Sequence, residues 1–195
     1  MKTSPRGLAF ITQWEGKAAW NPQKQLYFPY RDPVGYWTIG VGHLVKPGED
    51  FAEGITDERV TQLLASDVLK CENAIDDKVK VALEQNQFDA LVSWSFNVGV
   101  GALWSSTLLM RLNLGKYEEV PGMLLAWCRA GGKQNQGLLN RRKAEGKLWS
   151  TPYPAEPTEF PKAAPLLDLT EVARDADDAA RADTPLTWEK GKPVA

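Results

Sequence analysis

The sequence predicts an α+β fold that is predominantly helical and has two lobes. Short β-rich segments bounded by glycines lie near residues 35–42, which indicates a small antiparallel sheet in the N-terminal lobe. Apolar residues recur at helical spacing in most segments after residue 56, which indicates a helical C-terminal lobe. The chain has 195 residues, 43% of them hydrophobic, and can form one globular domain with an appendage.

The N-terminal segment predicts a short helix. Ser4 followed by Pro5 is typical of a helix start, and Leu8, Ile11 and Trp14 then recur at helical spacing. Gly16 can end this helix, so Glu15 is expected at its C-terminal end.

A loop and a small sheet are expected next. Residues 18–29 contain an Asn-Pro pair and no helical period, which predicts a loop. Residues 36–39 are β-rich and lie among Gly35, Gly40 and Gly42, which favours tight hairpins with Thr38 on a strand.

The helical part begins at Thr56. An apolar face that runs as far as Ile75 predicts one long helix, able to join the two lobes. A helix carrying Phe88 should end at Gly99 and Gly101. Three more helices are expected, one from Ser105 or Ser106 to Gly115 and two at about 116–129 and 139–149, with Gly131-Gly132 between the last two and Pro121 acceptable only in a first turn.

Composition changes near residue 150. Residues 1–149 carry 18 Lys and Arg against 16 Asp and Glu, whereas 150–195 carry 5 against 9 and hold seven of the 13 prolines. We therefore expect a folded domain over 1–149 and a Pro-rich acidic tail over 150–195, in which 171–183 could form an acidic helix.

Several classes of protein are disfavoured by composition. Neither part is basic enough to indicate a nucleic-acid partner. The apolar run 8–11 is too short for a signal peptide or a membrane anchor, so membrane insertion is not expected. Cys71 and Cys128 lack metal-ligand spacing; buried free thiols are favoured, with a disulfide as the open alternative.

Glu15, Asp32 and Thr38 are the first candidate chemical centre. Cleavage of a glycosidic bond needs a protonated acid for the leaving oxygen and a second carboxylate that activates water or stabilises positive charge. The C-terminal end of a helix disfavours an anion, which suits Glu15 to the role of acid. Residue types alone also fit two solvated surface carboxylates.

Other candidates are weaker. His43 is the single histidine, so a multi-histidine metal site is excluded and a structural, hydrogen-bonded or ion-paired role is favoured. The basic run 141–143 fits a solvated helix face as well as a functional one. Most of the eight tryptophans are expected in the core, and Trp20 is the best exposed candidate for contact with a sugar ring.

Residues 30–43, Tyr-Arg-Asp-Pro-Val-Gly-Tyr-Trp-Thr-Ile-Gly-Val-Gly-His, resemble the signature of the T-even and lambdoid phage lysozymes. These glycoside hydrolases cleave between N-acetylmuramic acid and N-acetylglucosamine. Residues 10–16 are similar to the family's N-terminal helix with its catalytic Glu-Gly. Further similar segments are 86–101, 106–109 and 137–145, so the resemblance covers about residues 4–149.

The resemblance implies a lysozyme-like fold with saccharide bound between the lobes and no metal or organic cofactor. It implies Glu15 as general acid, Asp32 as the carboxylate that positions or activates water, and Thr38 as a hydroxyl that helps to hold that water. An arginine, Arg141 or Arg142, could pair with the acid. The implied saccharide-binding residues are Leu44, Phe96 and Ser106.

One interval departs from the family pattern. The family commonly has eight residues between the catalytic Glu and Asp, whereas sixteen residues, 16–31, separate Glu15 from Asp32 here. The spacing from Asp32 to Thr38 is kept, so an enlarged loop is expected before the first hairpin. The tail 150–195 and the sequence pI of about 5.6 also differ from a basic enzyme that attacks an anionic wall.

The implied role is that of a monomeric endolysin that hydrolyses peptidoglycan for host-cell lysis. Such an enzyme would stay in the host cytoplasm until a holin lets it reach the wall. One alternative is a catalytically weak module that binds wall glycan. Another is a lysozyme of a virion or secretion device, with 150–195 as a docking peptide.

Overall fold

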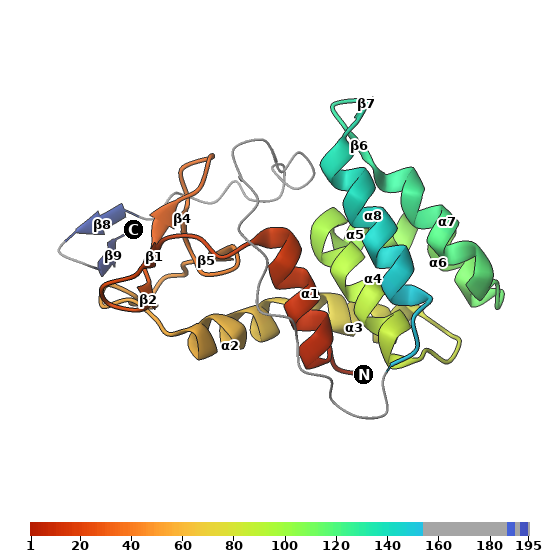
Figure 1. The fold of residues 1–195 in the computed structure, drawn as a ribbon, viewed down its shortest axis with the longest axis horizontal. Helices are drawn as coiled ribbons and strands as arrows, with labels where there is room; N and C mark the ends of the chain where they lie inside the picture. The colour runs from red at the N-terminus through yellow and green to blue at the C-terminus, as the bar shows by residue number, and fades with distance from the viewer. Residues whose placement is uncertain (154–186, 190–191, 195) are drawn as a thin grey trace. The chain divides into compact units, whose positions relative to one another are not determined.

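The computed structural model describes residues 1–153, 187–189 and 192–194, and the chain forms two compact units (Figure 1). One, the helical unit, contains residues 1–14 and 68–153. The other, the sheet unit, contains residues 15–67 and the described strands near the C-terminus. Helices with small antiparallel sheets confirm the predicted α+β class.

Helix α1 spans Pro5–Glu15, as predicted. The Ser4 hydroxyl caps it by accepting a hydrogen bond from the Gly7 N–H at 3.0 Å, and also donates to Asp89. A Cβ on Gly7 would lie 2.6 Å from Cγ of Asp89, so glycine permits this close approach to helix α4 (Gln85–Val98), which carries Asp89. Glu15 is the last helical residue and the first residue of the sheet unit.

The central sheet of the sheet unit has three antiparallel strands in the order β3-β4-β5. Their bounds are Tyr30–Arg31, Trp37–Ile39 and His43–Leu44. Gly35 and Gly40 have positive φ values of 101° and 62°, which confirms the predicted glycine turns. A Cβ on Gly40 would also lie 3.0 Å from a methyl carbon of Val60, so this turn packs closely on the next helix.

The predicted loop over 18–29 contains a second, smaller hairpin (Figure 1). Strands β1 (Trp20–Asn21) and β2 (Leu26–Tyr27) pair antiparallel, and the backbones of Tyr27 and Ile55 exchange hydrogen bonds of 2.9 and 2.8 Å. The loop prediction was therefore wrong in part. Two-residue strands are too short to show the alternation of polar and apolar residues that identifies a strand.

The long helix predicted from Thr56 is two helices, α2 (Asp57–Asp67) and α3 (Leu69–Lys78). They meet at Val68, where the sheet unit gives way to the helical unit. The apolar positions continue at helical spacing through Val68, which is fully buried, so periodicity could not reveal the break.

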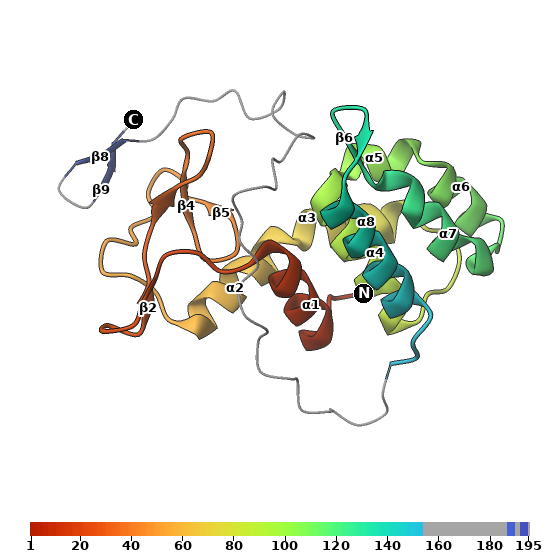
Figure 2. The same ribbon diagram turned by 45° about the horizontal axis from the view of Figure 1, so that its top comes forward.

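Helix α4 is the core of the helical unit and packs against α3, α5 and α8 (Figure 2). Phe88, Leu91 and Trp94 on α4 are fully buried. The bounds of the helices in this unit are α4 Gln85–Val98, α5 Val100–Ser105, α6 Thr107–Asn113, α7 Val120–Leu124 and α8 Gln136–Trp149, with 3₁₀ turns at Tyr117–Glu119 and Leu125–Trp127.

Two small elements of the helical unit were not predicted. Gly101 lies inside the short helix α5 rather than ending a helix. Gly131 and Gly132, both with positive φ, form the turn of a hairpin whose strands are β6 (Arg129–Ala130) and β7 (Lys133–Gln134). Pro121 lies in the first turn of α7, as the sequence required.

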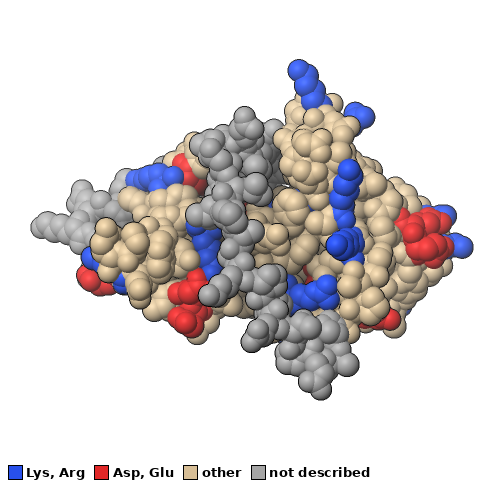
Figure 3. Space-filling view, in the orientation of Figure 1, with Lys and Arg blue, Asp and Glu red and all other residues tan. Residues whose placement is uncertain are grey.

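The basic run on α8 is not a solvated face. Arg141 and Arg142 are buried and both pair with the fully buried Glu145, with N–O distances of 3.2 and 3.1 Å. Ser93 of α4 donates a further hydrogen bond of 2.9 Å to Glu145. Of the three residues in the run, Lys143 alone is exposed. The surface over the position of α8 carries a row of basic side chains (Figure 3). The basic run 141–143 alone does not reveal that Glu145, one helical turn later, neutralises two arginines in the core.

The C-terminal part is described only in short pieces. Strands β8 (Thr187–Glu189) and β9 (Lys192–Val194) pair antiparallel. The acidic helix expected at 171–183 lies outside the described residues. None of the helices in the described ranges is long and apolar enough to cross a membrane.

Both cysteines are free thiols in the structure, as favoured from sequence. Cys71 is buried on α3, whereas Cys128 is only half-buried. The expectation that both would be buried is therefore correct for Cys71 alone.

His43 is buried between two carboxylates of the sheet unit, in agreement with a structural role. Its Nδ1 lies 2.8 Å from Asp67 and its Nε2 lies 3.0 Å from Glu49. Burial alone would lower the pKa of His43, but the hydrogen bonds and charges of Asp67 and Glu49 outweigh burial and raise it. Burial would raise the pKa of Glu49, but hydrogen bonds from the Lys46 N–H and from His43 lower it.

We predict that His43→Gln lowers the free energy of unfolding by roughly 2 kcal/mol at pH 5.5. The pKa of His43 is higher in the folded protein, so its charge contributes fully below the unfolded value of about 6.5 and less as pH rises through the folded value. The loss should therefore be smaller at pH 9. Urea denaturation at both pH values measures it, and equal losses would contradict an ionic contribution.

Candidate active site

Asp32 is held by the turn between β3 and β4. Its Oδ1 accepts hydrogen bonds from the backbone N–H groups of Val34, Gly35 and Tyr36, at 3.0, 2.8 and 2.8 Å. The side chain is half-buried. Three donors on one oxygen fix the position of the carboxylate before any substrate binds.

Thr38 is joined to Asp32 through one peptide group. The carbonyl oxygen of Tyr36 accepts a hydrogen bond from the Asp32 N–H at 3.0 Å and another from the Thr38 hydroxyl at 3.3 Å. Thr38 is fully buried on β4. Sequence reasoning brought Asp32 and Thr38 together correctly but missed Tyr36, whose backbone connects them; its place in the glycine turn was the only available signal.

Glu15 is the last residue of α1, and the chain that follows it is attached to the central sheet. The chain bends at Gly16, with φ of 75°, and the Ala18 N–H then donates to the Gly40 carbonyl at 3.3 Å. Gly40 lies two residues beyond Thr38. The segment after the half-buried Glu15 is therefore attached to the end of the strand that carries Thr38.

A backbone hydrogen bond joins the two ends of the segment that is added between Glu15 and Asp32. The Phe28 N–H donates to the Ala19 carbonyl at 3.0 Å, so the chain returns to where it left. The hairpin enclosed by this bond, residues 20–27, contains eight residues, which equals the excess over the interval implied by the family resemblance. The enlarged interval is thus a separate hairpin rather than a longer path between the two carboxylates.

Asp57, in the first turn of α2, anchors this hairpin. The Tyr27 hydroxyl donates to Asp57 Oδ1 at 3.1 Å, and Lys17 forms an ion pair with the same carboxylate. Burial, together with the charge of Asp57, raises the pKa of Tyr27 to about 12. The hydroxyl therefore stays protonated as a donor at neutral pH.

The three predicted saccharide-binding residues lie in different units. Leu44 of β5 is half-buried and faces Thr38 in the strand register, so it belongs with Asp32 and Thr38. Phe96 lies near the end of α4 and is half-buried. Ser106 caps α6 by accepting from the Leu109 N–H at 3.0 Å, and its hydroxyl also donates to the Leu103 carbonyl.

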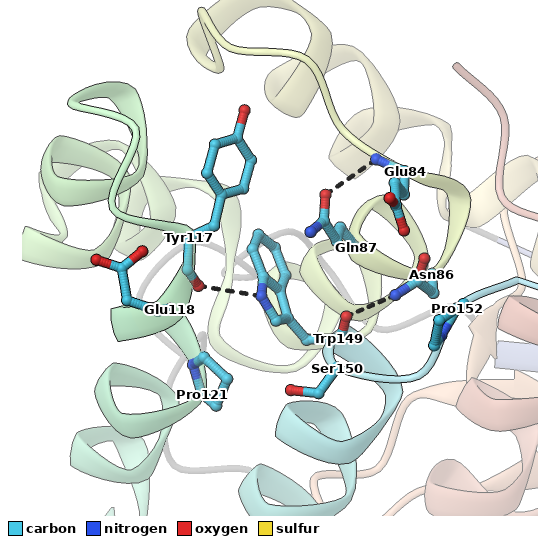
Figure 4. Close-up of a pocket in the computed structure, with 9 residues that line it drawn as sticks. All are labelled: Glu84, Asn86, Gln87, Tyr117, Glu118, Pro121, Trp149, Ser150 and Pro152. Carbon is cyan, nitrogen blue, oxygen red and sulfur yellow. Dashed lines mark hydrogen bonds between the residues drawn. The ribbon is translucent and has the colours of Figure 1, made fainter.

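A separate open pocket of about 410 Å³ lies in the helical unit (Figure 4). Trp149 borders it and donates through Nε1 to the Tyr117 carbonyl at 3.2 Å. The other lining residues come from the start of α4, the 3₁₀ turn Tyr117–Glu119, the start of α7 and the residues just after α8. None of them is a predicted catalytic residue.

Metal ligands are not gathered in the part of the chain that the structure describes. No group of three or more His, Cys, Asp or Glu side chains there is arranged to hold a metal ion. Both ring nitrogens of His43 already contact carboxylates.

Comparisons with known proteins identify the family of the chain. A sequence model described as phage lysozyme matches residues 26–145. The endolysin of Salmonella phage P22 is 44% identical over 123 residues, which cover 62% of this chain and 84% of that protein. The chain belongs to the phage lysozyme family.

Structural similarity extends over the whole of a family member. A mutant of the phage P22 lysozyme has a TM-score of 0.66 and 35% identity, covering 77% of this chain and 99% of that one. The endolysin of Bacillus phage B103 is 43% identical over 118 residues, and this chain spans only 44% of its length. The predictions of a phage-type lysozyme and of a glycoside hydrolase are confirmed, and a catalytically weak binding module is not favoured.

We predict that two substitutions of Asp32 separate its structural role from its chemical role. Asp32→Asn keeps an oxygen for the three backbone N–H donors and should unfold at nearly the wild-type temperature. Asp32→Ala removes that acceptor and should cost about 1–3 kcal/mol of unfolding free energy. Both should lose wall hydrolysis, measured as turbidity loss of permeabilised cells. An Asn variant as active as wild type would contradict a catalytic role.

Proposed function

We propose that this protein hydrolyses the β-1,4 bond between N-acetylmuramic acid and N-acetylglucosamine in bacterial peptidoglycan, as an endolysin. The observation that carries the proposal is the shared backbone of Tyr36, which holds Asp32 and Thr38 at one turn of the sheet unit. The carbonyl of Gly40, just after the strand that carries Thr38, also accepts a hydrogen bond from the N–H of Ala18 in the segment that follows Glu15.

Glu15 is the general acid in this proposal. It ends α1, where the negative end of the helix dipole favours a neutral carboxyl group over an anion. A neutral carboxyl can give its proton to the glycosidic oxygen as the bond to the leaving sugar breaks.

Asp32 and Thr38 act on the other side of the reaction. The Asp32 carboxylate, fixed through Oδ1, positions or activates the water that attacks the sugar. The Thr38 hydroxyl donates to Tyr36, and a hydroxyl that donates one hydrogen bond still offers its oxygen as an acceptor. Leu44, Phe96 and Ser106 contact the saccharide in this proposal.

The biological setting completes the proposal. Residues 1–149 form the lysozyme domain, which acts as a monomer. The protein remains in the host cytoplasm until a holin opens the way to the wall. Endolysin is the name carried by the phage P22 and phage B103 relatives, which supports this setting.

We predict that Glu15→Gln reduces lysis of permeabilised Gram-negative cells by 100-fold or more, because the leaving sugar then has no proton donor. Glu53→Gln is the matched control, since Glu53 is an exposed carboxylate of the same unit. The control should match wild type. Equal lysis by the Glu15 and Glu53 variants would refute the role of Glu15.

We also predict that removing residues 151–195 leaves wall hydrolysis within about threefold of wild type, because the family match ends at residue 145. Muropeptide release by purified protein measures the effect. Loss of hydrolysis would place the removed segment in the functional domain.

A further inference from the structure

The hairpin over residues 20–27 presents an exposed tryptophan. Trp20 is 45% exposed, and its ring lies 4.8 Å from that of Tyr27, its partner in the strand register. The two ring planes are tilted by 52°. The Trp20 ring therefore has one aromatic neighbour and still offers apolar surface to a ligand.

The ring behind Trp20 is fixed from several sides. Tyr27 exchanges two backbone hydrogen bonds with Ile55, and its hydroxyl donates to Asp57. Lys17 lies over the Tyr27 ring, 5.7 Å from its centroid. A ligand that stacks on Trp20 would thus meet a surface that is already ordered, which lowers the entropic cost of binding.

Two residues at the hairpin have backbone conformations that are unfavourable for residues other than glycine. Ala19 and Gln25, just before β1 and β2, have φ values of 60° and 55°. Residues other than glycine pay about 1 kcal/mol or more for this conformation. Strain of this kind is found preferentially where a segment has a function.

Charge favours an anionic glycan as the ligand. Residues 16–31 contain no Asp or Glu and carry Lys17, Lys24 and Arg31. Lys17 is paired with Asp57, and within the hairpin 20–27 itself Lys24 is the one charged residue. Lys24 lies 5.1 Å from the centroid of the Phe28 ring, next to the hairpin. Peptidoglycan strands offer apolar sugar faces for an indole and lactyl carboxylates for a lysine. An acidic polypeptide would use the charges but would leave the aromatic surface without a specific role.

We propose that this hairpin is an accessory glycan-binding platform. Trp20, backed by Tyr27, stacks on a sugar of the strand outside the pair whose bond is cleaved, and Lys24 contacts a carboxylate of the strand. The hairpin lies between Glu15 and Asp32 in the chain and is closed at Ala19 and Phe28, so it adds binding surface without changing the catalytic framework. The inference rests on peptidoglycan being the substrate.

The test measures binding apart from cleavage. All variants carry Glu15→Gln, and the probe is peptide-free glycan strands prepared by amidase treatment of sacculi, with the dissociation constant measured by calorimetry. Adding Trp20→Ala should weaken binding about tenfold, whereas Trp20→Phe should weaken it less because a ring remains. Trp104→Ala is the matched control, since Trp104 is 53% exposed in the helical unit, and it should bind within twofold of the parent. Thermal unfolding checks that each variant is folded.

Equal affinities of the Trp20→Ala and Trp104→Ala variants would overturn the platform. So would a loss on intact, peptide-bearing sacculi that is absent on peptide-free strands, because the ligand would then be the peptide. Release of muropeptides by the Glu15→Gln parent would instead count against the assigned role of Glu15. The comparison of Trp20 with Trp104 would keep its meaning in that case, because both variants share the same background.

Discussion

The candidate active site depends on the backbone of Tyr36. Its N–H donates to the Asp32 carboxylate, and its carbonyl accepts from both the Asp32 N–H and the Thr38 hydroxyl. A carboxylate and a hydroxyl six residues apart are thereby held at one turn by backbone hydrogen bonds. The turn itself requires Gly35, whose φ of 101° is readily adopted only by glycine.

The hairpin at residues 20–27 shows how the site tolerates added sequence. The bond from Phe28 to Ala19 closes the hairpin, and the bond from Ala18 to Gly40 attaches the preceding residues to the sheet. The chain around Glu15 is therefore positioned by contacts made before the hairpin begins. Asp57 then secures the hairpin through Tyr27 and Lys17, so the added residues are ordered without bearing on the turn at Asp32.

Local signals in the sequence were sufficient for much of this fold. The cap at Ser4, the glycine turns around Thr38 and the first-turn position of Pro121 each depend on a few neighbouring residues, and each was predicted. The break at Val68 leaves the apolar period intact, so no local pattern shows it. The burial of Arg142 and Glu145 depends on the packing of α8 against α4, which lies far away in the sequence. In the site, the motif identified Asp32 and Thr38, whereas the closed hairpin between Glu15 and Asp32 required the structure.

We propose that Glu15, Asp32 and Thr38 hydrolyse the glycosidic bond at C1 of N-acetylmuramic acid. The new reducing ends identify the bond that is cleaved: purified sacculi are digested, reduced with borohydride and examined by mass spectrometry. We expect new ends that are N-acetylmuramitol, formed by wild type and not by Glu15→Gln. New ends of N-acetylglucosaminitol or of anhydromuramic acid, or unchanged sacculi, would contradict it.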